Sequence, residues 1–322
     1  MPKRVLLICL GIIVAIFAAA IIFGGPGTPH PMGSITDPFG SVDFSDLPPL
    51  SEFTARDGTK LAYRHYVPTS TTPDQGSVVI VHGSSATSSS MHPMAKAFSA
   101  AGYPTFALDI RGHGSSGRKG QIAYIGQLED DLADFIHAVS PPQPMTLAGF
   151  SSGAGFAIRF AGSEQQNLFQ SYLFLAPFLS PDAPTTRPGS GGWASVGLPR
   201  IIAIASLNGF GIRTFNSLPV LRFAISENTK GILTPEYSYA LTMNFGPQRD
   251  YLANLRSMHQ PFRILVGAND EVYYPDQFAE VLKKAGKDTP VTIIPGVDHV
   301  QLILSPVAFE KSIEALKNFR SQ

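Results

Sequence analysis

The chain contains a single cysteine and no excess of charge of either sign. Because Cys9 has no second cysteine to pair with, a disulfide within the chain is excluded. Lysine and arginine together number 24, as do aspartate and glutamate, so the formal net charge is zero. Nucleic-acid binding rests on a basic surface, and this balance gives it no support. The sequence also has no metal-ligand spacing and no phosphate-binding glycine loop, so we predict no metal and no cofactor.

One long hydrophobic run is present, close to the start of the chain. Residues 5–23 are apolar or glycine without interruption, and Lys3 and Arg4 precede them. At a helical rise of about 1.5 Å per residue, these nineteen residues would span the hydrocarbon core of a bilayer. We therefore expect residues 1–25 to form a single-pass membrane anchor. Positive charge tends to stay in the cytoplasm, which predicts that the remainder faces the non-cytoplasmic side.

A cleaved signal peptide is the alternative, and it would give a secreted protein. Signal peptides have apolar cores of about 7–15 residues that end in a small-x-small cleavage site. Here the run is longer and ends in Phe23, so we favour an uncleaved anchor. Residues 26–50 contain many prolines and glycines and predict a spacer. Residues 51–322 are long enough for one catalytic domain.

The most informative motif is a G-x-S-x-G pattern centred on Ser151, which follows an apolar stretch over residues 145–148. A strand that turns sharply into a helix exposes a serine hydroxyl at such a pattern, and the flanking glycines let the backbone fold back tightly. Small residues follow at Ala154, Gly155 and Ala157 and predict a helix packed closely on a sheet. The pattern predicts a serine nucleophile; a chance turn in a glycine-rich chain is the alternative.

A serine hydroxyl is a weak nucleophile, so Ser151 requires a base and a group that orients the base. Strand-like apolar runs over residues 262–266 and 290–295 are followed by Asp270 and His299, respectively. The order serine, aspartate, histidine is that of α/β-hydrolases, and it differs from the orders in the chymotrypsin and subtilisin classes. We therefore predict a catalytic triad of Ser151, Asp270 and His299.

Two other aspartates compete with Asp270 for the acidic position. Asp276 follows a proline and predicts the first turn of the next helix, where negative charge suits the helix dipole. Asp298 adjoins His299, and neighbouring side chains on a turn rarely point at one another. His299 itself has an alternative as an ordinary loop histidine. The placement of the candidates at strand ends favours Asp270 and His299.

Catalysis at Ser151 also requires an oxyanion hole made of two backbone amides. The amide of Ser152, directly after the nucleophile, is one candidate. The amide of Ser84 is the second, because it lies in the loop after the apolar strand-like run 78–81. His82, in the same loop, could be a second catalytic histidine, but we interpret it as structural, holding the loop by hydrogen bonds.

A further run reads Asp109-Ile-Arg111-Gly-His113-Gly. Together with the His82-Gly83 loop and the serine motif, it resembles the monoacylglycerol lipase and lysophospholipase-like (serine aminopeptidase S33-type) branch of the α/β-hydrolases. The resemblance extends from about residue 53 to the C-terminus, with a divergent stretch over about residues 180–258. It implies an ester-hydrolase function, and it assigns Arg111 and His113 to scaffolding.

The sequence departs from that family at two places. Phe150 precedes the nucleophile where a histidine is common, and residues 82–85 read His-Gly-Ser-Ser without the usual following glycine and acidic residue. Both departures concern the preference for the acyl chain and the alcohol and leave the catalytic roles intact.

Alternation of apolar runs and helical patterns predicts an α/β fold with a mostly parallel eight-stranded sheet and helices on both faces. A hairpin of residues 53–56 and 61–66 should turn at Asp57-Gly58. The insertion of about residues 181–258 is longer than an ordinary connection and predicts a helical cap over the serine. Its apolar side chains indicate an apolar substrate or simply bury one another. The remaining predicted strands are 78–81, 105–108, 145–148, 172–175, 263–266 and 291–294, and the helices lie near 91–101, 125–139, after 151, 276–285 and 306–320.

These features predict a serine ester hydrolase that cleaves lipid-like acyl esters through an acyl-enzyme on Ser151 and uses no cofactor. They do not predict an oligomeric state. An acyltransferase or a peptidase of the same fold shares the chemistry up to the acyl-enzyme. From another class, a noncatalytic membrane-tethered binding protein would keep the fold for its pocket alone.

Overall fold

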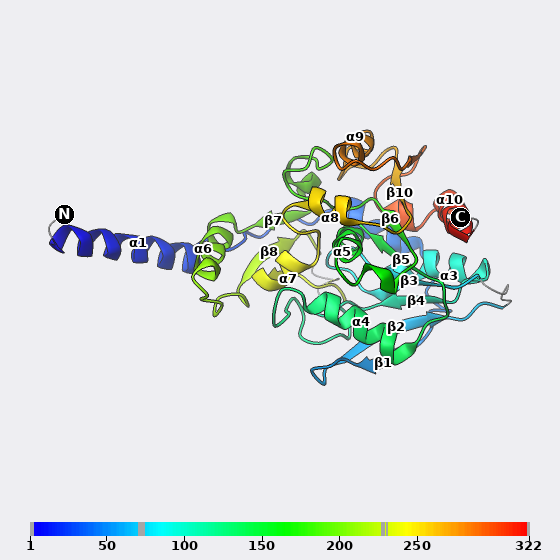
Figure 1. The fold of residues 1–322 in the computed structure, drawn as a ribbon, viewed down its shortest axis with the longest axis horizontal. Helices are drawn as coiled ribbons and strands as arrows, with labels where there is room; N and C mark the ends of the chain where they lie inside the picture. The colour runs from blue at the N-terminus through cyan, green and yellow to red at the C-terminus, as the bar shows by residue number, and fades with distance from the viewer. Residues whose placement is uncertain (1–2, 70–74, 227–228, 230, 321–322) are drawn as a thin grey trace.

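An eight-stranded sheet forms the centre of the domain in the computed structural model, which describes residues 3–69, 75–226, 229 and 231–320 (Figure 1). The strand order is β1-β2-β4-β3-β5-β6-β10-β11; β2 is antiparallel to both of its neighbours and the other pairs are parallel. The predicted, mostly parallel sheet is therefore confirmed. The strands are β1 (Leu50–Thr54), β2 (Lys60–Tyr66), β3 (Ser77–Val81), β4 (Thr105–Leu108), β5 (Met145–Phe150), β6 (Ser171–Leu175), β10 (Phe262–Gly267) and β11 (Val291–Ile294).

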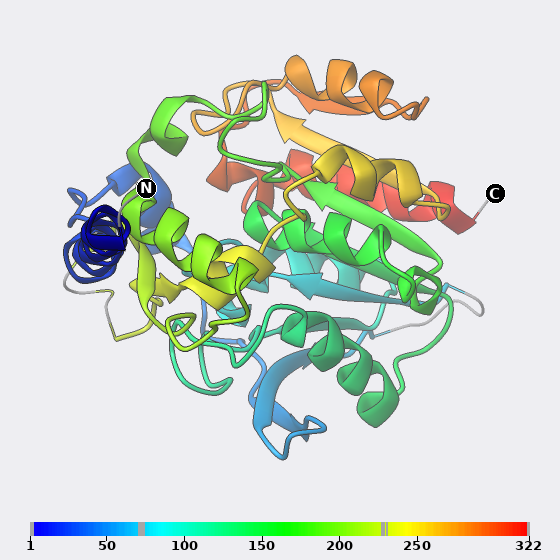
Figure 2. The same cartoon turned by 60° about the vertical axis from the view of Figure 1, so that its left-hand side comes forward.

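Helices cover both faces of this sheet, as Figure 2 shows. Helix α10 packs with α3 on one face, and α5 packs with α8 on the other. Because both faces are covered, every residue of β3 and β5 is buried, which is why these strands read as apolar runs. The helices around the sheet are α3 (His92–Ala100), α4 (Gln127–Val139), α5 (Ser152–Ala161), α8 (Tyr251–Ser257), α9 (Gln277–Lys284) and α10 (Pro306–Arg320).

The insertion between β6 and β10, which we call the cap, contains more than helices. A three-stranded antiparallel sheet in the order β7-β8-β9 stands beside helix α6. These strands were not predicted, because each is short and the burial of its residues does not alternate regularly along the chain. The elements of the cap are η4 (Pro188–Gly192), β7 (Ala194–Val196), α6 (Leu198–Gly209), β8 (Pro219–Phe223), β9 (Glu236–Ser238), α7 (Tyr239–Asn244) and α8.

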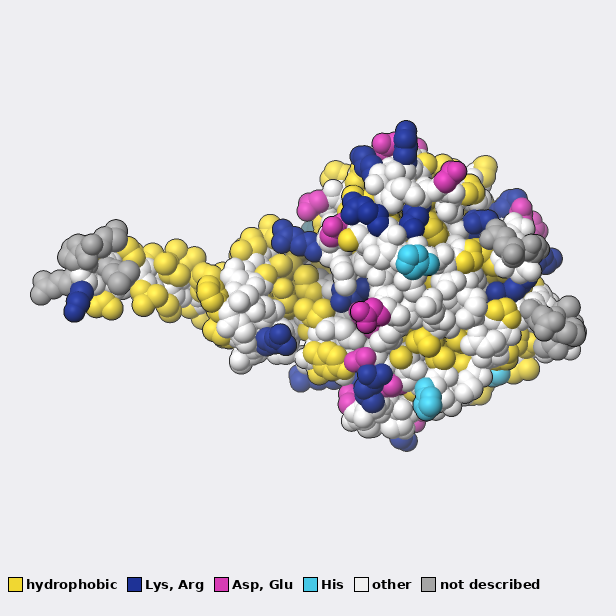
Figure 3. Space-filling view, in the orientation of Figure 1, with side chains coloured by type: hydrophobic (Ala, Val, Ile, Leu, Met, Phe, Trp, Pro, Cys, Tyr) yellow, Lys and Arg dark blue, Asp and Glu magenta, His cyan; other side chains and the backbone are white. Residues whose placement is uncertain are grey.

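The N-terminal helix α1 (Lys3–Phe23) extends away from the domain, and hydrophobic side chains cover much of its surface (Figures 1 and 3). Within the described residues, no helix has the length and apolar character needed to cross a bilayer. The predicted membrane anchor over residues 1–25, and with it the predicted membrane localisation, is therefore wrong. The prediction assigned the whole run to lipid, whereas its last turn is held by the cap: Arg200 of α6 donates hydrogen bonds to the carbonyls of Ile21 and Ile22.

The segment that follows α1 lies against the domain. It includes the short helices α2 (Gly33–Thr36) and η1 (Asp37–Ser41). The amide of Met32 donates to the carbonyl of Ala224 over 2.9 Å, and Met32, Ile35 and Phe39 pack on the hydrophobic core. Residues predicted as a spacer thus form part of the domain surface.

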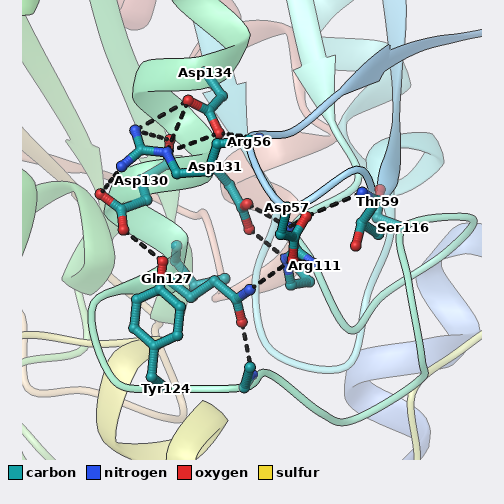
Figure 4. A network of polar contacts seen from close by, with 12 residues as sticks. Arg56, Asp57, Thr59, Arg111, Ser116, Tyr124, Gln127, Asp130, Asp131 and Asp134 are labelled. Atoms are coloured by element: carbon teal, nitrogen blue, oxygen red, sulfur yellow. Dashed lines mark hydrogen bonds and ion pairs between the residues drawn. The ribbon is translucent and has the colours of Figure 1, made fainter.

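The Asp-x-Arg-Gly-His-Gly run builds scaffolding, in agreement with the role implied by the resemblance. Asp109 accepts hydrogen bonds from the amides of Ser88 and Ser115, which joins two loops. Arg111 lies between Asp131 of α4, at 2.6 Å, and Asp57 in the turn between β1 and β2, at 3.0 Å (Figure 4). This ion pair ties the first hairpin to a helix on the face of the sheet.

We expect Arg111→Gln to destabilise the protein strongly. The side chain of Asp131 is only 9% exposed, so the substitution leaves a buried carboxylate without its cation. Removing one partner of a buried ion pair costs about 3–5 kcal/mol, and the midpoint of urea unfolding should fall accordingly. Lys311→Gln is the control, because it breaks an exposed pair with Glu314 and should leave the midpoint unchanged. Equal midpoints for both variants would contradict the scaffold role.

Candidate active site

Ser151 occupies a strained turn between β5 and α5. Its φ is 54°, in the left-handed region that residues with a Cβ rarely adopt. The two flanking glycines are required by space: a Cβ at Gly149 would collide with the carbonyl oxygen of Gly153, and a Cβ at Gly153 would collide with that of His82. The two glycines of the G-x-S-x-G pattern therefore allow α5 to pack closely on β5 and on the end of β3, which places Ser151 at the end of β5.

The structure brings the three predicted triad residues together. Ser151 Oγ lies 3.2 Å from His299 Nε2, and His299 Nδ1 lies 2.8 Å from Asp270 Oδ2. The other carboxylate oxygen of Asp270 accepts hydrogen bonds from the amides of Val272 and Tyr273, each at 2.8 Å. With Nδ1–H donated to the carboxylate, Nε2 is left as an acceptor facing the serine hydroxyl.

The competing aspartates have other partners. Asp298 accepts a hydrogen bond from the amide of Gln301 at 2.8 Å, and Asp276 accepts one from the side chain of Gln277 at 3.0 Å. Both are turn or helix-start contacts, as the sequence suggested. Asp270 alone of the three is hydrogen-bonded to the ring of His299 within the described residues.

Burial and charge oppose one another at both ends of the Asp270–His299 pair. Burial by itself would raise the pKa of Asp270, but the adjacent His299 and the two amides outweigh it, so the pKa is lowered. Burial by itself would lower the pKa of His299, but the Asp270 carboxylate outweighs it, so the pKa is raised. The pair is thus arranged to hold a carboxylate beside a ring that readily accepts a proton.

Both predicted oxyanion donors are available. The amides of Ser84 and Ser152 have no hydrogen-bond partner within the described part of the chain, and both residues line the same cavity as Ser151. The neighbouring amide of Ser85 is already committed, since it donates to the Tyr237 hydroxyl at 2.5 Å. Ser85 has φ of 69°, a conformation that favours glycine, and its side chain donates to the carbonyl of Thr234 at 2.7 Å. The two hydrogen bonds hold Ser85 in this conformation.

The ring nitrogens of His82 form hydrogen bonds with backbone atoms, and the ring packs against His113 and Phe245, which agrees with the structural interpretation. Its Nε2 accepts from the amide of Ile110 at 3.3 Å, so Nδ1 carries the proton and donates to the carbonyl of Gly83 at 2.7 Å. Burial lowers the pKa of His82 and also that of His113, which keeps both rings neutral. His113 in turn lies 2.6 Å from the Tyr237 hydroxyl. These histidines therefore hold the loop that carries Ser84.

A cavity of about 1090 Å³ opens above the serine. Its floor contains Ser151 and His299, and its walls are mainly apolar. Most wall residues come from the cap, but Ile35 and Phe39 of the N-terminal segment also line it. This volume lies at the upper end of the range of roughly 300–1,000 Å³ that is typical of small-molecule pockets, which leaves room for a long chain.

Sequence reasoning missed three side chains at the site. The Tyr273 hydroxyl lies 3.4 Å from Ser151 Oγ. Trp193 of the cap donates from Nε1 to Ser84 Oγ at 3.1 Å. Arg187, at the start of the cap, donates from Nε to the carbonyls of Asp270 and Tyr273. The only available signals were the position of Tyr273 three residues after Asp270 and the single tryptophan of the chain.

The chain is similar in sequence to known proteins. The family model described as serine aminopeptidase, S33, matches residues 72–303. A monoacylglycerol lipase from Mycolicibacterium smegmatis is 32% identical over 114 residues. That match covers 34% of this chain and 39% of the length of the relative.

Solved structures show the same fold at low identity. A monoglyceride lipase from Saccharomyces cerevisiae, in complex with a substrate analogue, has a TM-score of 0.65 and 18% identity, covering 87% of this chain and 98% of the other. A membrane phospholipase A, described as a bacterial virulence factor, has a TM-score of 0.58 and 18% identity, covering 99% of this chain and all of the other. The family match over residues 72–303 and this shared architecture lead to one conclusion: the chain belongs to the serine aminopeptidase S33 family of α/β hydrolases.

Proposed function

We propose that this protein is a serine ester hydrolase that cleaves lipid-like acyl esters through an acyl-enzyme on Ser151. The observation that carries the proposal is the hydrogen-bonded line from Ser151 through His299 to Asp270, placed at the floor of an apolar cavity. Similarity to proteins named as monoacylglycerol lipases supports the same reaction class.

The chemistry follows from the positions of the donors and acceptors. Ser151 Oγ attacks the acyl carbonyl while its proton passes to His299 Nε2. Asp270 stabilises the imidazolium, and the amides of Ser84 and Ser152 hold the oxyanion. The proton on His299 then goes to the departing alcohol oxygen, leaving the acyl group on Ser151. Water enters, gives its proton to His299 and releases the fatty acid by the same steps.

The walls of the cavity support an apolar acyl group over a peptide. A peptide would bring backbone amides and carbonyls against side chains such as Phe39, Ile201 and Leu221, which offer no hydrogen bonds. An acyl chain buries only apolar surface there, at roughly 0.8 kcal/mol per methylene. The acyl-enzyme could also pass its acyl group to another alcohol, so transferase activity is an outcome to be measured beside hydrolysis.

Substitutions in the triad should abolish turnover without unfolding the protein. Ser151→Ala and Asp270→Asn are expected to lower kcat for p-nitrophenyl esters, the aspartate change by on the order of 10⁴-fold. Asp298→Asn and Asp276→Asn are the matched controls and should stay close to wild type. If Ser151→Ala kept its ester hydrolysis and its labelling by a fluorophosphonate, the mechanism would be wrong.

The pH dependence should report His299. Only the neutral ring accepts the serine proton, so kcat/KM should fall as the pH drops through the pKa of His299. Because Asp270 raises that pKa, the acidic limb should lie above the ordinary histidine value of 6.5. Asp270→Asn removes the largest raising charge, although Glu271 and Asp298 still act on the ring, so the pKa of His299 should fall and the acidic limb should move to lower pH. The plateau of kcat/KM should fall as well. An unmoved limb in this variant would contradict the electrostatic coupling.

Chain-length preference should depend on the N-terminal segment. Ile35→Trp adds bulk to a wall of the cavity, so methylenes of a long acyl chain lose their place. With roughly 0.8 kcal/mol per methylene, exclusion of two methylenes should lower kcat/KM for a p-nitrophenyl laurate by about tenfold, with little change for the butyrate. Val67→Trp, at an exposed residue outside the cavity, is the control. Equal effects on both esters would place Ile35 outside the acyl path.

A further inference from the structure

Tyr273 carries a buried hydroxyl for which the triad mechanism has no use. The residue is 3% exposed and lines the cavity. Its hydroxyl lies 3.4 Å from Ser151 Oγ and has no other hydrogen-bond partner among the described residues. A buried hydroxyl without a good partner is costly, whereas phenylalanine would fill the same space without that cost. The hydroxyl therefore points to a group that is present only when substrate is bound.

The position of this side chain is set by the catalytic acid. The amide of Tyr273 donates to Asp270 Oδ1, and its carbonyl accepts from Arg187 of the cap. Its ring stands edge-on to the ring of His299, with the centroids 5.2 Å apart. The loop that orients His299 thus also places the phenol next to both Ser151 and His299.

The protonation state of Tyr273 makes it a donor. Burial raises its pKa, and the nearby Asp270 raises it further, so the phenol stays neutral at physiological pH. In the resting site, the serine hydroxyl donates to His299, which leaves a lone pair of Ser151 Oγ to accept from the phenol. When Ser151 attacks, its Oγ becomes an ester oxygen, which is a weak acceptor, while the leaving alcohol oxygen gains negative charge and becomes a strong one. The phenol then gains more from donating to the leaving oxygen than to Ser151 Oγ.

We propose that Tyr273 donates a hydrogen bond to the leaving alcohol oxygen of the ester as the acyl-enzyme forms. This inference rests on the proposed hydrolase function. The leaving oxygen must come to His299 Nε2 to be protonated, and the Tyr273 hydroxyl stands beside that ring and beside Ser151 Oγ. In the proposed mechanism the carbonyl oxygen is held by the amides of Ser84 and Ser152 and does not compete for the phenol.

The step balances without any further reactant. The bond from Ser151 Oγ to the acyl carbon forms, and the bond from that carbon to the alcohol oxygen breaks with its electron pair staying on oxygen. The proton that completes the alcohol comes from His299, and Tyr273 keeps its own. In deacylation, the attacking water takes the same place beside Tyr273 and His299.

The test compares two leaving groups on one acyl chain. Nitrophenolate is a weak base that departs without help, whereas a glyceryl alkoxide requires stabilisation and a proton. We expect Tyr273→Phe to lower kcat/KM, which reports acylation, by about tenfold for the monoacylglycerol and by less than about twofold for the p-nitrophenyl ester. Tyr274→Phe is the matched control, because its ring lies under Arg187 and outside the triad; it should change neither value.

Other outcomes overturn the inference in distinguishable ways. An equal loss on both esters would mean that Tyr273 only positions Ser151, and no loss on either would mean that it has no role in the reaction. Fluorophosphonate labelling of Tyr273→Phe at the wild-type rate would show a folded protein with an intact nucleophile. Absence of labelling in the wild type would refute the hydrolase function itself. If Tyr273→Phe does not fold, Tyr273→Met removes the same hydroxyl and must show the same dependence on the leaving group.

Discussion

The close approach of α5 to β5 and β3 is the contact on which the site depends. Gly149 and Gly153 remove the Cβ atoms that would keep these backbones apart. Only at that distance is Ser151 forced into its left-handed turn, with the hydroxyl outward and the amide of Ser152 at a helix start. The strain at Ser151 is opposed by backbone hydrogen bonds on both sides, from its amide to Leu175 and from Phe178 to its carbonyl.

The cap does more than enclose the cavity, because it holds the loop of residues 82–85, whose Ser84 amide is the predicted oxyanion donor. The Tyr237 hydroxyl accepts from the amide of Ser85 and faces His113, while Thr234 forms a reciprocal pair of hydrogen bonds with Ser85. Trp193 adds a contact to Ser84. The positive φ of Ser85 is therefore maintained by cap residues rather than by glycine. The geometry of the loop of residues 82–85 and the position of the cap are therefore physically coupled.

Sequence reasoning was strongest where one physical rule acts locally. Parallel strands covered on both faces are mainly apolar, so β3 and β5 were predicted from their composition. The need for glycine at positions 149 and 153 follows from the lack of room for a Cβ atom there. The order along the chain led to the candidates Ser151, Asp270 and His299, whose catalytic roles stay a prediction. The strands of the cap and the position of Tyr273 were not predicted, because neither has a local sequence signature. Both depend on contacts between segments far apart in the sequence.

The N-terminal region was predicted wrongly because its local pattern does not show which distant residues it contacts. Its apolar run has the composition of a membrane segment, yet its end is hydrogen-bonded to Arg200, and the following residues Ile35 and Phe39 close a wall of the cavity. Apolar character reports only that a surface prefers to leave water, and it does not say which partner covers it. Among the described residues, the cap contacts only the last turn of the helix, where Ile21 packs on cap residues, while most side chains of the helix are exposed. The sheet carries the predicted triad, while the cap and the N-terminal segment line the cavity in which we propose that an acyl chain lies.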